Sequence, residues 1–177
     1  LGTAYVTRAL LPGMKAAGGG RIVFTSSMAG QAGIYGYVAY SASKFALVGM
    51  AQALQMEVKA YGIGVAVAYP PDTDTPGFGV ENQGKPLATH RISEGSGLFS
   101  AALVAAKIVK GVKRGDFCIT VGMDGYLLAL GTQGFSPCFS VVEAILQVMS
   151  VGVLRAATFF YNWSFYRIAA QEKIKKE

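Results

Sequence analysis

The chain has 177 residues, 52% of them hydrophobic and 15% charged, and a formal net charge of +6 at pH 7. That length suffices for one domain with a sizeable core. The basic residues form no long run with interleaved aromatics, which argues against a nucleic-acid partner. Cys118 and Cys138 supply neither a disulfide framework nor metal-ligand spacing, and His90 is the only histidine, so we expect no metal site and a reducing compartment.

The positive charge gathers at residues 107–114 and 167–176, in or beside apolar segments. This arrangement suits contact with an anionic membrane surface, and a solvated helix face explains it equally well. The sequence starts with Leu1 and not with methionine. We therefore expect a carboxyl-terminal fragment of a longer protein.

Helices and strands alternate in the first part of the chain. Residues 1–17 have helical apolar spacing, and three glycines at positions 18–20 fit a helix stop and a tight connection. The apolar pattern then predicts a strand over residues 21–25, a helix over 37–60 and a second strand over 63–69.

The next part continues the alternation after a polar stretch. Residues 79–97 are too polar and mixed for core, and we expect a loop there. Ser100 is a suitable N-cap for a helix over 101–114, which Gly115 ends, and residues 117–121 offer a third strand. The order is typical of the α/β class with a parallel sheet and crossover helices.

The end of the chain changes character. We divide the sequence into a catalytic part over residues 1–125 and an apolar, basic-ended helical tail over residues 126–177. Aromatic residues crowd positions 159–166 beside basic residues, as in interfacial membrane anchors. Charges interrupt the apolar run, so a spanning helix is not assured. We expect a membrane-associated tail, as an embedded hairpin or as a helix lying on the surface, and a helix packed against the fold is the alternative.

Tyr40 and Lys44 stand four residues apart in the predicted helix, with only small residues between them. Positions i and i+4 share one helix face, so the ammonium group can lie near the phenol. A nearby cation stabilises the phenolate and lowers the tyrosine pKa from about 10 towards the range useful for acid–base catalysis. By itself, this spacing also fits a partly exposed amphipathic pair.

Polar residues follow two of the predicted strands. Ser26 and Ser27 come directly after the first, where open α/β sheets bind ligands, and a hydroxyl there can hold a substrate carbonyl. The segment PPDTDT, residues 70–75, follows the second strand. Its Asp72 and Asp74 fit turn formers better than metal ligands.

Ser27, Tyr40 thirteen residues later, and Lys44 together resemble the catalytic set of the short-chain dehydrogenases/reductases. This family has a Rossmann-like, doubly wound parallel sheet, of which the chain would be the carboxyl-terminal part. The resemblance implies that Tyr40 protonates a carbonyl oxygen as hydride arrives from a nicotinamide. It further implies that Lys44 lowers the tyrosine pKa and binds the nicotinamide ribose, and that Ser27 orients the substrate.

The cofactor segment of the family also has a counterpart. A Pro-Gly-x-x-x-Thr segment, which holds the nicotinamide amide, is similar to residues 70–75, except that Pro71 stands where glycine is usual. The resemblance thus assigns Pro70, Pro71, Thr73 and Thr75 to the cofactor, beside Tyr40 and Lys44. The family's glycine-rich dinucleotide turn is not found in the sequence. We therefore expect the amino-terminal cofactor half to be missing.

Several segments resemble one branch of that family: AYPPDTDTPGF, AYSASKFAL, LQMEVK and DGYLLAL. The resemblance implies NADPH-dependent reduction of a long-chain sphingoid ketone in sphingolipid synthesis. It implies attachment to the endoplasmic reticulum membrane, with the active site facing the cytosol. A hydroxysteroid or retinol dehydrogenase and a truncated, non-catalytic membrane-associated module are the alternatives, and a homo-oligomer stays open.

Overall fold

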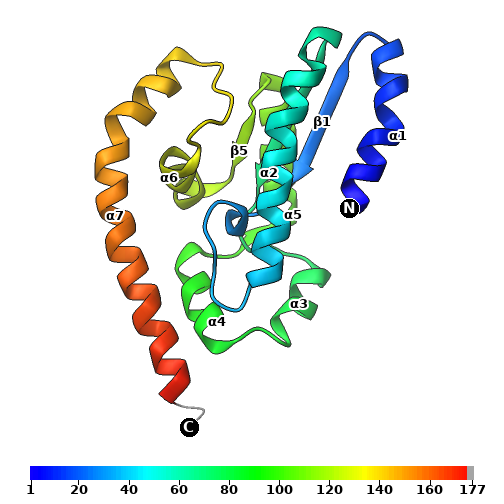
Figure 1. The fold of residues 1–177 in the computed structure, drawn as a ribbon. Coiled ribbons are helices and arrows are strands. Elements are labelled where there is room, and N and C mark those ends of the chain that lie inside the picture. The colour runs from blue at the N-terminus through cyan, green and yellow to red at the C-terminus, as the bar shows by residue number, and fades with distance from the viewer. Residues whose placement is uncertain (175–177) are drawn as a thin grey trace.

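A parallel β-sheet lies at the centre of the molecule, for which a computed structural model describes residues 1–174 (Figure 1). Its strands are β1 (Gly20–Thr25), β2 (Ile63–Tyr69) and β5 (Cys118–Thr120), in the order β1-β2-β5. All three predicted strands and the α/β class are thereby confirmed. A small second sheet pairs β3 (Thr73–Asp74) in parallel with β4 (Phe99–Ser100).

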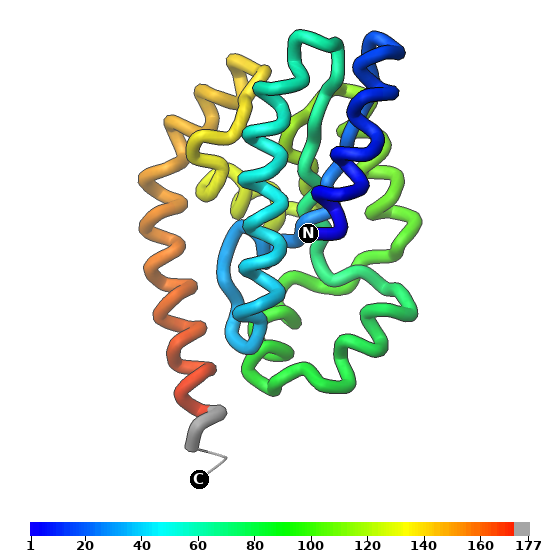
Figure 2. Tube along the Cα trace, turned by 45° about the vertical axis from the view of Figure 1, so that its right-hand side comes forward, coloured from blue at the N-terminus to red at the C-terminus, as the bar shows by residue number. Residues whose placement is uncertain are grey.

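Helices cover both faces of the central sheet (Figure 2). α1 (Gly2–Ala16) and α2 (Val38–Val58) pack on one face, and α5 (Ala101–Arg114) packs on the other. Alternate residues of β2 enter two separate core clusters, which explains its continuous apolar sequence. The cluster on the α2 side contains Ile63, Val65, Val67 and Tyr69, and the cluster on the α5 side contains Ala66 and Ala68.

The predicted helix ends are confirmed at two places. Ser100 caps α5, because its hydroxyl accepts a hydrogen bond from the backbone N–H of Leu103 at 3.3 Å, and Gly115 ends the helix in the left-handed conformation. Gly18, at a φ of 75°, and Gly19 lie between α1 and β1, and Gly20 begins β1. They form the helix stop and connection that the sequence predicts.

The polar stretch after residue 79 is not a loop, which corrects the sequence-based expectation. It contributes to α3 (Pro76–Asn82) and α4 (Leu87–Ser93). Thr75 caps α3, since its hydroxyl accepts the N–H of Phe78 at 3.1 Å. Thr89 of α4 is fully buried, and its hydroxyl donates to a backbone carbonyl of the loop before α2 at 2.6 Å. The Thr89 hydroxyl can be buried here because it has a hydrogen-bond partner in another part of the fold.

The tail forms two helices, α6 (Gly122–Thr132) and α7 (Val141–Ile174), so the boundary expected after residue 125 falls inside α6. Figure 1 shows α7 running along the side of the molecule. Within it, Val141–Gln171 is long and apolar enough to cross a membrane, and no other helix in the described residues is. Its charged residues do not break the helix. Three short 3₁₀ turns complete the fold: η1 (Met28–Gly30), η2 (Lys59–Tyr61) and η3 (Glu94–Ser96).

Candidate active site

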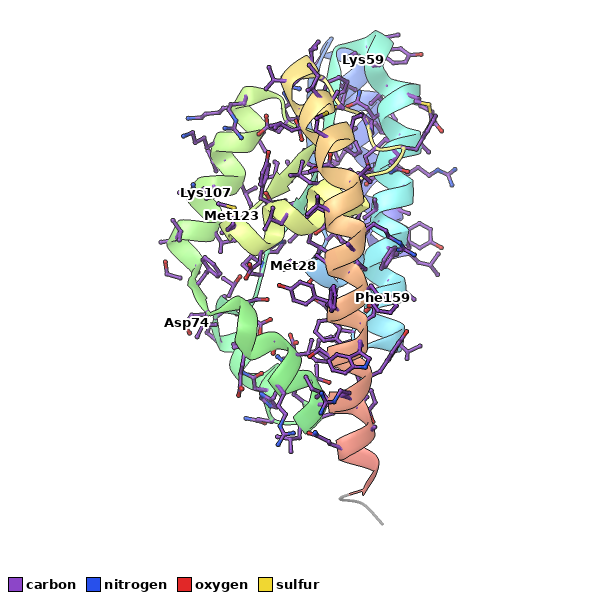
Figure 3. The ribbon with its side chains drawn as sticks, turned by 90° about the vertical axis from the view of Figure 1, so that its left-hand side faces the viewer. Met28, Lys59, Asp74, Lys107, Met123 and Phe159 are labelled. Carbon is purple, nitrogen blue, oxygen red and sulfur yellow. The ribbon has the colours of Figure 1, made fainter. Side chains whose placement is uncertain are left out.

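The polar segments that follow β1 and β2 meet at one edge of the sheet. The backbone N–H of Ser26 donates to the carbonyl of Ala68 at 2.8 Å, and that of Met28 donates to the carbonyl of Pro70 at 3.3 Å. α2 begins beside this junction, and α3 and α4 lie beyond it (Figure 1). Figure 3 shows Met28 between the sheet and the segment that carries Asp74. The predicted site residues are therefore brought to one region, at the carboxyl ends of the strands.

The two serines after β1 have different environments. Ser26 is 1% exposed, and its hydroxyl donates to the main-chain carbonyl of Lys44 at 3.0 Å. Ser27 is half-buried, and its hydroxyl accepts the N–H of Ala29 at 3.2 Å and also hydrogen-bonds with Tyr40. Ser26 thus fixes the catalytic helix to the strand end, whereas Ser27 is the serine that meets the tyrosine.

Tyr40 and Lys44 lie together on α2, as their spacing predicts. The Lys44 ammonium is 5.5 Å from the centre of the Tyr40 ring and donates to the carbonyl of Thr25 at 3.0 Å. Tyr40 remains 38% exposed, so its phenol can be reached from solvent. Burial lowers the pKa of Lys44, and the carboxylate of Glu81 raises it in part.

The pKa of Tyr40 does not follow the prediction made from its spacing to Lys44. Partial burial raises this pKa above its ordinary value; the hydrogen bond with Ser27 lowers it, and the charges of Glu81 and Asp72 raise it. The physical reason is the partial burial of the phenol, the largest of these effects, which outweighs the lowering by Ser27. At neutral pH the phenol therefore keeps its proton.

The segment at residues 70–75 forms the turn after β2. Pro71 is buried and Pro70 is half-buried. The Thr73 hydroxyl donates to the carbonyl of Pro71 at 2.8 Å, and the Thr75 hydroxyl, besides capping α3, donates to the carbonyl of Thr73 at 3.4 Å. Both threonine side chains therefore shape the turn itself.

The residues on α2 fit the sugar of a nicotinamide nucleotide. An ammonium and a phenol on one helix face can hydrogen-bond the two hydroxyls of a ribose, and Lys44 spends one of its three N–H donors on Thr25. The glycines at positions 18–20, in contrast, do not fit the diphosphate of such a nucleotide. They precede a strand and contact the backbone of Gly62, so they cannot place phosphates at a helix N-terminus.

A further group of side chains adjoins Tyr40, and we call it the Tyr37 cluster. It consists of Tyr37, Asp72, Phe78, Glu81 and Lys85. The rings of Tyr37 and Tyr40 have centres 5.2 Å apart, and the Tyr37 hydroxyl donates to the carboxylate of Glu81. Burial and this hydrogen bond raise the pKa of Tyr37.

A buried ion pair anchors the same cluster. The side chain of Lys85 is 1% exposed, and its ammonium lies 3.3 Å from the carboxylate of Asp72 and 5.2 Å from the centre of the Phe78 ring. Sequence reasoning missed these residues. Tyr37 is the N-cap residue of α2, three positions before Tyr40, and its ring lies beside that face of the helix. Nothing in the sequence links that face to side chains more than forty residues later.

Sequence comparisons place the chain among proteins of one kind. A family model described as short chain dehydrogenase matches residues 1–86. A 3-dehydrosphinganine reductase of Danio rerio is 50% identical over 177 residues, which are 100% of this chain and 53% of the relative. A 3-ketodihydrosphingosine reductase of Bos taurus is 49% identical over 176 residues, 99% of this chain and 53% of the relative. The chain spans about half the length of the curated relatives it matches.

Solved structures show the same fold. A short chain dehydrogenase from Burkholderia cenocepacia, in complex with NADP, superposes with a TM-score of 0.61 at 19% identity, covering 76% of this chain and 51% of that one. A short-chain dehydrogenase from Streptomyces avermitilis gives 0.59 at 27% identity, covering 86% and 57%. Together with the serine, tyrosine and lysine at the strand ends, these findings show that the chain is similar in sequence to short-chain dehydrogenases and has their fold.

Proposed function

We propose that the protein with this chain reduces 3-ketodihydrosphingosine to dihydrosphingosine in sphingolipid synthesis, with NADPH as cofactor. The observation that carries the proposal is the meeting of Ser27, Tyr40 and Lys44 at the sheet edge. The Danio rerio and Bos taurus relatives, which are 50% and 49% identical to the chain, are named as reductases of this ketone. Because they are nearly twice as long, the proposal concerns the intact protein.

The proposed roles follow from the geometry. NADPH, when bound, supplies a hydride to the ketone carbon. Ser27 holds the carbonyl oxygen near the phenol, and Tyr40 gives its proton to that oxygen, so that the ketone becomes a secondary alcohol. The raised pKa of Tyr40 keeps the phenol protonated at neutral pH, which a proton donor requires. Lys44 would hold the nicotinamide ribose with its remaining N–H groups.

The turn after β2 would lie against the nicotinamide. We assign this role to Pro70, Pro71, Thr73 and Thr75. The two threonine hydroxyls already stabilise the turn, so we assign the cofactor contacts to its backbone groups. The prolines limit the motion of the turn, which supports a fixed position for a bound ring.

Replacement of Tyr40 tests the catalytic proposal. In the intact protein, Tyr40→Phe removes the proton donor and should lower kcat for 3-ketodihydrosphingosine reduction by roughly 10²-fold or more. Circular dichroism and thermal unfolding should show a folded protein, because the lost hydroxyl is partly exposed. Tyr61→Phe, in η2 beyond the other end of α2, is the matched control. Substantial activity in Tyr40→Phe would refute the role of this phenol, and a preference of the wild type for steroid or retinoid ketones would refute the substrate.

We further propose that residues 126–177 attach the catalytic part, residues 1–125, to the endoplasmic reticulum membrane, with the active site facing the cytosol. Support comes from α7. None of the residues in the most apolar part of Val141–Gln171 is buried in the protein. The guanidinium of Arg167 lies 4.7 Å from the centre of the Trp163 ring, and such aromatic and basic pairs suit the membrane interface. A long-chain substrate that partitions into lipid gives the attachment a purpose.

A further inference from the structure

Glu81 is a carboxylate at the candidate active site to which the catalytic roles give no task. It belongs to α3 and accepts a hydrogen bond from Tyr37, whose ring packs beside that of Tyr40. Its charge acts on the pKa values of both Tyr40 and Lys44, so the carboxylate lies within electrostatic reach of the catalytic pair. Glu81 is exposed and therefore open to a ligand.

Among the described residues, no cation forms an ion pair with Glu81. The neighbouring carboxylate, Asp72, is neutralised by the ammonium of Lys85. Glu81 itself forms no ion pair among the described residues, and the nearby cation of Lys44 is held by the Thr25 carbonyl. The Lys44 charge acts on Glu81 only from a distance, so within the described part of the chain the Glu81 carboxylate has no bonded cation beside the phenol. Such a charge favours a ligand that brings a cation to the same place.

The proposed substrate has a cation where this charge would meet it. In 3-ketodihydrosphingosine, the carbon next to the ketone carries an amino group, which is protonated at neutral pH. A ketone whose oxygen lies at Tyr40 therefore brings an ammonium group one carbon away. Resting on the proposed function, we propose that Glu81 binds this ammonium and makes the enzyme specific for 2-amino ketones.

A second effect accompanies this binding. In the substrate-free structure, the negative charge of Glu81 raises the pKa of Tyr40 and so weakens the phenol as an acid. An ammonium seated on Glu81 offsets that charge, which brings the pKa of Tyr40 down as the ketone arrives. The amino group of the substrate would then assist its own reduction, and ketones without it would be poorer in kcat as well as in KM.

The test compares two substrates in two variants of the intact protein. One substrate is 3-ketodihydrosphingosine, and the other is a ketone of the same chain length without the amino group. Glu81→Gln should lower kcat/KM for the amino ketone roughly 10-fold or more, because a hydrogen bond to a charged group is lost. For the ketone without the amino group it should change kcat/KM less than about 3-fold. Glu57→Gln, an exposed carboxylate far along α2, should change neither.

The outcomes separate this inference from the proposed function. A wild-type protein that reduces neither ketone refutes the proposed function. A wild-type protein that reduces both equally well, or a Glu81→Gln variant that loses the same factor on both, overturns the role of Glu81 and leaves the reductase assignment standing.

A measurement on the wild type alone guards against a Glu81→Gln variant that does not fold. The preference for the amino ketone should shrink as the pH rises through the pKa of the substrate amine, about 8 by analogy with an α-amino group. Tyr37, Tyr40, Lys44, Asp72 and Lys85 are the other ionisable groups around Glu81, and they act on both ketones alike. The ratio of the two kcat/KM values therefore isolates the substrate's charge. A ratio that stays constant from pH 6 to pH 9 contradicts the inference.

Discussion

Single residues fix the position of the catalytic helix through very close packing. The hydroxyl of Ser26 donates to the Lys44 carbonyl, and Gly30 stands against both residues. A Cβ atom on Gly30 would lie 2.3 Å from the Ser26 hydroxyl oxygen and 3.1 Å from the Lys44 main chain. No rearrangement of a flexible side chain can relieve the contact with the main chain, so the position requires glycine.

Replacement of Gly30 tests this packing. Gly30→Ala should lower the free energy of unfolding by about 1–3 kcal/mol, because the added methyl group overpacks a filled space. It should also lower kcat/KM, since Lys44 and the neighbouring Ser27 must shift. Urea denaturation and steady-state kinetics of the intact protein measure the two effects. Gly33→Ala in the same loop meets nothing within 4 Å and should be nearly neutral. Equal effects of the two substitutions would contradict the packing argument.

The sequence predicted part of the site at this scale. The placement of Tyr40 beside Lys44 followed from a spacing of four in one helix, and Ser27 followed from a family resemblance. The structural task of Ser26 could not be predicted, because its partner is a backbone carbonyl eighteen residues later. The same holds for Glu81, whose partner Tyr37 lies forty-four residues earlier. Contacts over such separations have no local pattern.

Among the elements, α3 and α4 are held to the sheet edge by one buried ion pair. Lys85 lies in the connection between these helices, and Asp72 lies in the turn after β2. The backbone carbonyl of Asp72 also accepts the N–H of Phe99, beside the small β3–β4 sheet. The pair therefore joins the segment that carries Glu81 to the strand end that carries the predicted cofactor turn.

Replacement of Asp72 tests how much its ion pair with Lys85 contributes to stability. Asp72→Asn leaves the Lys85 ammonium buried without its counterion. The free energy of unfolding should fall by about 3 kcal/mol. Water that reaches the partly exposed position 72 would reduce this loss. Asp74→Asn, on an exposed residue of the same turn, should cost less than about 0.5 kcal/mol. Denaturant titration of both variants measures the difference. Equal stabilities would show that the pair does not hold the segment.

Elements with strong local signals were predicted, and elements that depend on distant contacts were not. α5 has an N-cap serine, an apolar period and a terminal glycine, so both of its ends could be located. α3 and α4 are seven residues each and mostly polar, and the sequence suggested a loop. Such short helices gain most of their stability from tertiary contacts, here the buried Thr89 and Lys85, rather than from their own sequence.

At the scale of the whole molecule, α7 lies along the domain and packs against α6 and α4. The side chain of Arg91 in α4 donates to that of Gln171 near the end of α7 at 3.0 Å. In α6, Gly131 leaves room for Leu154 of α7. α7 is thus held against α4 and α6, while much of its apolar surface remains exposed.

Vesicle binding tests the membrane role of that surface. The intact protein should float with vesicles of neutral and anionic lipids. Phe159→Ser with Trp163→Ser should weaken binding roughly 10-fold or more, because each exposed aromatic side chain contributes about 1.5–3 kcal/mol when buried in lipid. Met56→Ser with Phe135→Ser removes two exposed apolar side chains outside α7 and serves as control. Equal losses in the two double variants would contradict a membrane contact through α7.

The sequence predicted an apolar helical tail, and it could not predict where that tail lies. The prediction of a membrane-associated segment rests on composition and aromatic crowding, which are local properties. The position of α7 depends instead on single contacts such as Arg91 with Gln171, eighty residues apart. The choice between a hairpin and a surface helix likewise depends on packing that no periodicity encodes.

α4 gives the tail a direct connection to the catalytic helix. One of its residues, Arg91, bonds to α7, and another, Thr89, bonds to the loop that leads into α2. If α7 rests on a bilayer, as proposed, α4 lies close to the lipid, and the proposed ketone substrate would reach the site from the membrane. Delivery of substrate then becomes a two-dimensional encounter. Turnover would depend on the mole fraction of ketone in the membrane, so that added inert lipid slows the enzyme although the amount of ketone in the tube is unchanged.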